Sequence, residues 1–153
     1  MTNLQKYSLV LLRLSLGWLF FYSGITKILN PAWSAAGYLK GAKTFISFYQ
    51  WLLTPSVLPV INFLNEWGLT LVGVSLILGV FVRWGSYAGI LLMVLYYLPI
   101  LQFPMVGDRS YIVDEHIIYI FAFLILAGFD AGKTWGLENR ISAIFGGRKT
   151  EIV

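Results

Sequence analysis

The sequence predicts an all-α protein, a membrane four-helix bundle with an amphipathic interfacial segment between its first and second helices. Hydrophobic residues make up 58% of its 153 residues and charged residues only 12%, whereas about a quarter of a soluble domain is charged. A soluble domain of this size has too much surface to cover with so few charges. No repeat or linker divides the chain, so residues 1–153 are interpreted as a single domain.

Four apolar runs are predicted to cross the bilayer, because each approaches the length of about 20 residues that a spanning helix needs. The first run follows Lys6 and is interrupted only by Arg13 and Lys27, and the third stops at Pro104. The predicted spans cover residues 7–29, 57–82, 84–103 and 111–129.

Two further segments are expected to lie at the membrane surface. Residues 30–55 are too polar to span, but Phe45, Tyr49 and Leu52 recur at helical spacing. We expect this segment to lie on the membrane or to cap the bundle. The cytoplasmic tail, residues 133–153, has apolar residues at helical spacing and is expected to begin with a short interfacial helix.

The positive charges predict the orientation of the chain, because Lys and Arg concentrate in cytoplasmic loops. We expect a multi-pass protein of the cell membrane with both termini in the cytoplasm, since an even number of spans returns the chain to its starting side. The net charge of +4 is interpreted as loop charge, not as a nucleic-acid footprint. The cytoplasmic side would carry Lys6, Arg83, Lys133, Arg140, Arg148 and Lys149, and the opposite side Lys27, Lys40, Lys43 and Arg109.

The composition also excludes several kinds of redox site. The chain has no cysteine, which excludes disulfides, iron–sulfur clusters, Cys-ligated zinc and thiol chemistry within it. It has one histidine, so it cannot build a bis-His haem by itself. With no flavin motif either, any redox cofactor other than a quinone would come from a partner subunit.

Polar side chains are predicted to meet at one depth near the extracytoplasmic side. Lys27, Glu66 and Glu115 come out roughly 30, 24 and 22 Å above the inner face at the helical rise per residue. The apolar stretch after His116 is too short to cross alone, so the fourth span must include Asp114, Glu115 and His116. Consecutive positions differ by about 100° around a helix, so at least one of the three points into the bundle.

Such a cluster is suited to proton transfer at a quinone. Carboxylates and a histidine in a low-dielectric pocket can exchange protons near neutrality, and Trp and Tyr rings pack well against a quinone ring. No metal site is expected. The candidate catalytic residues are Glu66, His116, Glu115 and Asp114, and the candidate cofactor-binding residues are Lys27, Trp67, Tyr96 and Tyr97.

Structural roles for the same residues remain open. His116 can instead hydrogen-bond Glu66, Lys27 can form an ion pair with Glu66, and Asp114 can cap its helix. Lower in the membrane, Arg13 is expected to pair with Asp130. Lys40 and Lys43 are interpreted as loop charges, with attraction of an anionic substrate such as a sulfur oxyanion as the alternative.

The sequence resembles the DoxX/DoxD membrane protein family over nearly its whole length. Residues 13–27, which contain an Arg, two Gly and a Lys, resemble the family's first helix. Glu66, Gly73, Gly79 and Arg83 resemble the pattern of its second helix. Residues 113–118, followed later by Gly136, Leu137 and Glu138, resemble its last helix and ending, although Glu138 stands where the family often has Asp.

The resemblance implies a four-helix bundle that serves as a membrane subunit of a quinone-linked oxidoreductase. Thiosulfate is a candidate substrate, as it is for the DoxD subunit of thiosulfate:quinone oxidoreductase. The expected partners are the lipid bilayer and other subunits of a membrane redox complex, with no nucleic acid. The alternative is a non-catalytic membrane scaffold or accessory subunit of a respiratory or redox complex. A third hypothesis is a small transporter or channel, but the sequence contains no pair of broken helices of the kind that transporters use.

Overall fold

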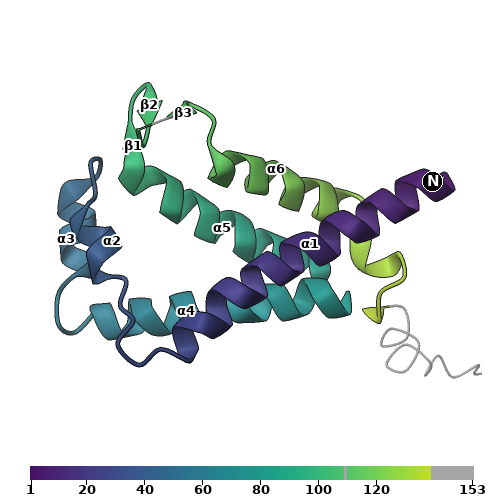
Figure 1. Ribbon diagram of the computed structural model, residues 1–153, viewed down its shortest axis with the longest axis horizontal. Coiled ribbons are helices and arrows are strands. Elements are labelled where there is room, and N and C mark those ends of the chain that lie inside the picture. Colours follow the sequence, from purple (N-terminus) through teal and green to yellow (C-terminus); the bar gives the residue numbers. More distant parts are fainter. Residues whose placement is uncertain (109, 139–153) are drawn as a thin grey trace, which may run out of the picture.

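The computed structural model describes residues 1–108 and 110–138. These residues fold mainly into helices (Figure 1), which confirms the predicted all-α class. The elements are α1 (Asn3–Ile28), α2 (Ala36–Lys40), α3 (Ile46–Leu52), α4 (Leu58–Leu78), α5 (Val82–Ile100), β1 (Leu101–Gln102), β2 (Met105–Val106), β3 (Ser110–Tyr111), α6 (Glu115–Gly128) and the 3-10 helix η1 (Ala131–Lys133).

The four long helices form two pairs, α1 with α4 and α5 with α6. Figure 1 shows α4 and α5 close together where the chain turns between them and diverging toward α2 and α3. The bundle therefore has two different ends. We call the end with the α4–α5 turn and the N-terminus the closed end, and the end next to α2 and α3 the cavity end.

Local sequence signals account for the helix boundaries. The Thr2 side chain caps α1 in a reciprocal capping box with Gln5. Pro59 lies in the first turn of α4, where its missing N–H costs nothing. Gly79 ends α4 with a φ of 67°, in the left-handed region that favours glycine.

Three predicted spans extend beyond the helices that the structure contains. The span predicted over 57–82 overruns α4, which ends at Leu78 because Gly79 terminates it. Residues 101–103 and 111–113 are not helical, because β1, β2 and β3 form a small antiparallel sheet there, with Leu101 opposite Val106 and Val106 opposite Ser110. The helix α5 ends just after Pro99, which has no N–H to donate. The helix α6 begins only at Glu115, because Asp114 caps it.

Within the described residues, two helices are long and apolar enough to cross a membrane, α1 and α4. The helix α6 has 14 residues, fewer than the length of about 20 that a span needs. The number of crossings and the side on which the termini lie stay predictions.

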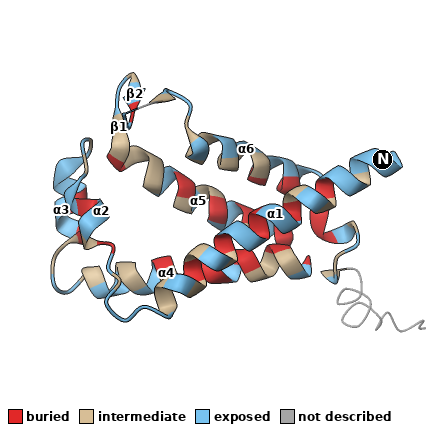
Figure 2. Cartoon of the chain, viewed as in Figure 1, coloured by how far each residue is buried: buried red, intermediate tan, exposed pale blue. Residues whose placement is uncertain are grey.

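The closed end holds the main core. Buried positions concentrate where α1, α4, α5 and α6 come together at this end (Figure 2), and Leu76, Phe123 and Leu126 are fully buried there. Backbones approach closely between α1 and α4, since a Cβ on Gly73 would lie 2.3 Å from the backbone nitrogen of Phe21. This helix pair therefore requires glycine at that position.

Arg13 is buried at the closed end, but the prediction that it pairs with Asp130 is wrong. Its guanidinium donates to the carbonyl oxygens of Ala131 at 2.6 Å and Thr134 at 3.0 Å. Asp130 instead forms ion pairs with Arg83 at 2.6 Å and Lys133 at 3.1 Å. The backbone that follows α6 therefore binds the terminal nitrogens of Arg13, whereas its buried Nε has no hydrogen-bond partner.

Gly79 allows this arrangement. A Cβ at that position would lie 2.6 Å from the Cα of Gly136 and 2.8 Å from a guanidinium nitrogen of Arg13. The backbone amides of Leu137 and Glu138 donate to the end of α4, which holds the segment in place. The rest of the predicted tail helix, including Ile141 and Phe145, lies outside the described residues, as does Arg109.

The segment between α1 and α4 caps the cavity end. Ala35, Leu39, Tyr49 and Leu52 form its own small core. Several side chains tie this cap to α5: the hydroxyls of Tyr38 and Tyr49 donate to the carbonyls of Tyr96 at 2.5 Å and Leu95 at 3.1 Å, and Thr44 bonds Leu98. The outward face of the cap exposes aromatic and apolar side chains, namely Phe45, Ile46, Phe48 and Trp51.

Candidate functional site

A cavity of about 870 Å³ lies at the cavity end, between the diverging helices and beneath the cap. All four long helices contribute to its wall. Most of the wall is apolar, and the polar and aromatic groups are few enough to define how a ligand would be oriented. Those side chains are Phe20, Ser23, Lys27, Trp33, Ser34, Tyr38, Tyr49, Asn65, Tyr96, Glu115, His116 and Tyr119.

Asp114 and His116 form a hydrogen-bonded pair at the start of α6. Oδ1 of Asp114 accepts the backbone amides of His116 and Ile117, and Oδ2 lies 2.5 Å from Nδ1 of the His116 ring. A carboxylate only accepts hydrogen bonds, so this contact places the Nδ1 proton toward Asp114. Nε2 is then the ring nitrogen left for a ligand in the cavity that His116 lines.

Tyr96 connects the polar groups of three elements. Its ring meets the ring of His116 edge-on, with 6.1 Å between centroids, and that of Tyr38 at 5.8 Å. Its hydroxyl interacts with the side chain of Asn65 on α4. The three residues Asn65, Tyr96 and His116 therefore form a continuous polar patch on the cavity wall, which we call the head patch.

Asn65 is one of the cavity residues that sequence reasoning missed, as are Ser23, Tyr38 and Tyr119. The side chain of Asn65 is only 8% exposed, it lines the cavity, and its Oδ1 has no hydrogen-bond partner. A buried unsatisfied amide oxygen is costly. The apolar positions Leu69, Val72 and Leu76 continue the helical period from position 65, which was the available signal that Asn65, and not its neighbour, faces inward.

Glu66 occupies a different place from the one expected. It does not line the cavity, and the ring of His116 bonds Asp114 in place of Glu66. The ion pairs among the described residues do not include Lys27 with Glu66. Glu66 still acts electrostatically on Lys27, whose ammonium donates to the Ser23 carbonyl at 2.8 Å and lies 5.4 Å from the Trp33 ring centroid.

The remaining candidates divide between the cavity wall and its surroundings. Lys27, Tyr96, Glu115 and His116 line the cavity, whereas Asp114 touches it only through His116. Trp67 is 43% exposed and packs near Phe63. The hydroxyl of Tyr97 donates to the Ile112 carbonyl at 2.6 Å.

The cap contributes neutral hydrogen-bonding groups. Burial raises the pKa of the Tyr38 and Tyr49 hydroxyls, so both stay protonated at neutral pH. Lys40 and Lys43 are exposed on the cap and do not line the cavity. Within the described residues no cluster of His, Asp or Glu is arranged to hold a metal ion.

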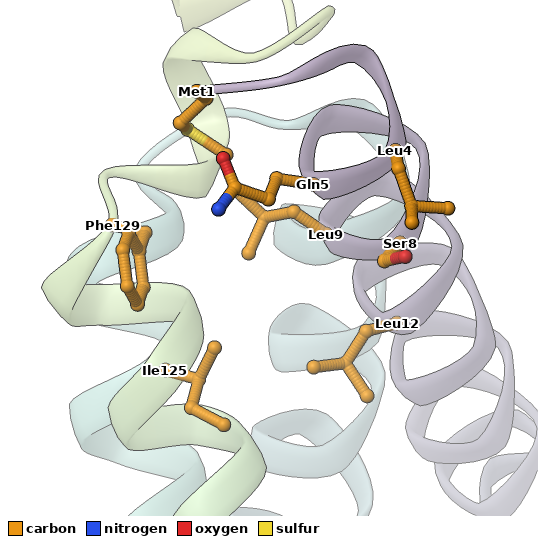
Figure 3. A pocket seen from close by; sticks show the side chains of 8 residues that line it. All are labelled: Met1, Leu4, Gln5, Ser8, Leu9, Leu12, Ile125 and Phe129. Carbon is orange, nitrogen blue, oxygen red and sulfur yellow. The ribbon is translucent and has the colours of Figure 1, made fainter.

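A smaller cavity of about 380 Å³ lies at the closed end, between the start of α1 and the end of α6 (Figure 3). Figure 3 shows apolar side chains such as Leu9, Leu12, Ile125 and Phe129 around it. Gln5 and Ser8 are the polar side chains among its lining residues, and none of the lining side chains titrates. This cavity therefore lacks the groups that proton chemistry needs.

Comparison with known proteins gives one match. The family model described as DoxX matches residues 8–100, which include α1, the cap, α4 and α5. No curated protein and no solved structure matches the chain.

Proposed function

Because this chain belongs to the DoxX family of membrane proteins, we propose that it is the membrane subunit of a quinone-linked oxidoreductase and holds a quinone ring in the cavity beneath the cap. The observation that carries the proposal is the cavity itself. Its volume of about 870 Å³ falls within the range of about 300–1,000 Å³ typical of small-molecule sites. Its wall combines apolar side chains with aromatic rings, a histidine and a carboxylate.

The residues on the wall fit such a ring. Asn65 brings a buried amide with an unused oxygen, and Tyr96 brings a hydroxyl beside it. Lys27 supplies a positive charge on the opposite pair of helices from Tyr96. These groups would orient the ring oxygens, and the leucines of the wall would exclude water from the ring.

A quinone supplies two-electron chemistry that is coupled to the uptake of two protons. His116 would hold the transferable proton on Nε2, because Asp114 fixes the other ring nitrogen. Glu115, which is exposed and also lines the cavity, would pass protons between His116 and the surrounding water. Asp114 is therefore a positioning residue, and Glu66 would adjust the field at Lys27 from outside the wall.

The electrons would come from another subunit of a membrane redox complex. We propose thiosulfate as the donor substrate, by analogy with the family, and a cell-membrane location with several crossings and both termini in the cytoplasm. The cavity then lies in the outer half of the bilayer, on the side away from Arg13.

The test is ring binding by the purified protein in lipid nanodiscs. Quenching of Trp fluorescence by decylubiquinone should saturate, and Tyr96→Phe and His116→Gln should each weaken binding about tenfold, the loss of one good hydrogen bond. Tyr97→Phe is the matched control, because that hydroxyl bonds a loop carbonyl and not the cavity.

Turnover is tested separately, by following thiosulfate-dependent quinol formation in native membranes with and without the chain. Saturable binding without such turnover would reject thiosulfate and keep the quinone site. Absence of saturable binding in the wild type would reject the quinone site and leave the non-catalytic scaffold as the function.

A further inference from the structure

We infer that the cavity has a side exit between α4 and α5, and that its ligand is a quinone with a hydrocarbon tail that leaves through this exit into the bilayer. The inference rests on the proposed function and adds the tail and its route. It starts from the observation that some side chains line the cavity and are also exposed on the outside of the molecule.

Facing stripes of α4 and α5 form the exit. Cavity-lining positions recur on α4 at residues 61, 64, 65, 68 and 69, and on α5 at residues 88, 91, 92, 95 and 96, with Met93 beside them. This is the spacing of one helical face. Asn65 and Tyr96 are the polar members of these stripes, and the others are Ile, Leu, Ala, Met and Gly.

The outer edge of this face is open. Leu64 is 55% exposed and Leu91 is 61% exposed, although both line the cavity. Neighbouring outward residues on the same helices are apolar as well, including Leu71 and Val94. A membrane surrounding α4 would therefore present hydrocarbon to the exit.

Small residues keep the exit open at its deeper end. A Cβ placed on Gly68 would meet only one atom within 4 Å, Cδ1 of Leu92 at 3.6 Å, which is ordinary contact. Ala88 is exposed and also lines the cavity. At these two positions α4 and α5 contribute no bulky side chain of their own, and the side chain that faces Gly68 is the flexible Leu92.

The opposite rim of the cavity does not suit a tail. Between α1 and α6 the lining includes Ser23, Lys27, Glu115 and His116. Placing hydrocarbon against these groups would remove their hydration without replacing it. A ligand with its ring at the head patch would therefore lie with its polar end toward α6 and its tail between α4 and α5.

The experiment compares two probes in nanodiscs: decylubiquinone and the same ring without its decyl tail. Gly68→Phe narrows the exit from α4, and Leu91→Trp narrows it from α5, at a position that is 61% exposed. Each variant should weaken the binding of decylubiquinone about tenfold, the equivalent of roughly two buried methylene groups. The affinity for the tail-less ring should stay within about twofold of that of the wild type. Because each probe is compared with itself in the wild type, differences in partitioning into lipid cancel.

Val94→Trp is the matched control, since it adds the same bulk to α5 at a position that does not line the cavity. Leu19→Trp places that bulk at the α1 side of the cavity and should affect both probes alike. A selective loss of the tailed probe in Leu19→Trp, or an equal loss of both probes in Gly68→Phe and Leu91→Trp, would overturn the proposed exit. Failure of both probes to bind the wild type would reject the quinone site itself, which is a different result.

Discussion

The closed end and the cavity end each place a cation from α1 among other helices, with different consequences. At the closed end Arg13 is 2% exposed and donates to backbone carbonyls that follow α6. At the cavity end Lys27 donates to a carbonyl of its own helix and faces a cavity of about 870 Å³. Arg13 therefore stabilises the fold, whereas the ammonium of Lys27 can still donate hydrogen bonds to a ligand.

The glycines of α4 show the same contrast. Gly73 lies where the backbone of α1 leaves no room for a Cβ, whereas Gly68 borders the cavity with room for one. Close packing at one end therefore stabilises the bundle while the other end stays open. Polar residues at the two ends should accordingly differ in whether their loss affects stability or binding.

The largest effect is expected for Arg13→Met. The change removes a buried guanidinium and its hydrogen bonds to the carbonyls of Ala131 and Thr134, so it should lower the free energy of unfolding by about 4 kcal/mol. Denaturant unfolding in detergent micelles measures this. Arg83→Met is the control, because that arginine forms an exposed ion pair worth at most about 1 kcal/mol; equal losses would contradict the structural role of Arg13.

Next in size is Gly73→Ala, compared with Gly68→Ala. The first should destabilise the protein by about 1–3 kcal/mol, because the backbone of α1 at Phe21 has to move. The second should be neutral or stabilising by up to about 1 kcal/mol, since alanine is the better helix former and its Cβ finds space. The midpoints of thermal unfolding of the two variants measure this difference. A lower midpoint for Gly68→Ala than for Gly73→Ala would refute the contrast in packing.

At the cavity end, Asp114→Ser separates capping from orientation of the histidine. Serine still caps α6, so the free energy of unfolding should change by less than about 1 kcal/mol. It does not reproduce the bond to Nδ1 of His116, so quinone affinity and its pH dependence should both change. Isothermal titration across a pH series measures the affinity; a fall in stability with unaltered binding would make Asp114 a cap alone.

The smallest effect concerns the exposed charges beside α6. The hydrogen bond from Lys133, together with the charge of Arg83, lowers the pKa of Asp130. A carboxyl whose folded-state pKa is lowered adds stability above its ordinary pKa and loses it as the pH falls through the lowered value. In Asp130→Asn the midpoint of thermal unfolding should therefore fall less between neutral pH and about pH 3 than in wild type; an unchanged slope would contradict this.

Predictions based on one helix at a time were the more successful ones. The long apolar runs that became α1 and α4 and the Asp114 cap are local features that the chain carries in neighbouring residues. The prediction for Arg13 identified the right segment but the wrong group, because the carbonyls of Ala131 and Thr134, and not the Asp130 carboxylate, accept its hydrogen bonds. Spacing within a helix carries no information about such partners.

The same reasoning separates Glu66 from Asn65. The two residues lie at nearly the same depth along α4. A prediction from depth alone therefore cannot separate them, and it favoured Glu66 because Glu66 is charged. They differ by about 100° in direction around the helix. The apolar period marks the face of Asn65 as the inward one, and the packing of α1 and α5 against α4 places a cavity there.

The amino-acid sequence alone determined that the protein is helical and belongs in a membrane, because both properties sum small contributions from many residues: apolar content, helical period and scarcity of charge. Tertiary structure decided which polar side chains share a cavity and which form hydrogen bonds that only stabilise the fold. Those outcomes depend on the rotation of each helix about its axis and on contacts between segments that are distant in the sequence. A small rotation of a helix moves a side chain from the cavity wall to the outside of the bundle.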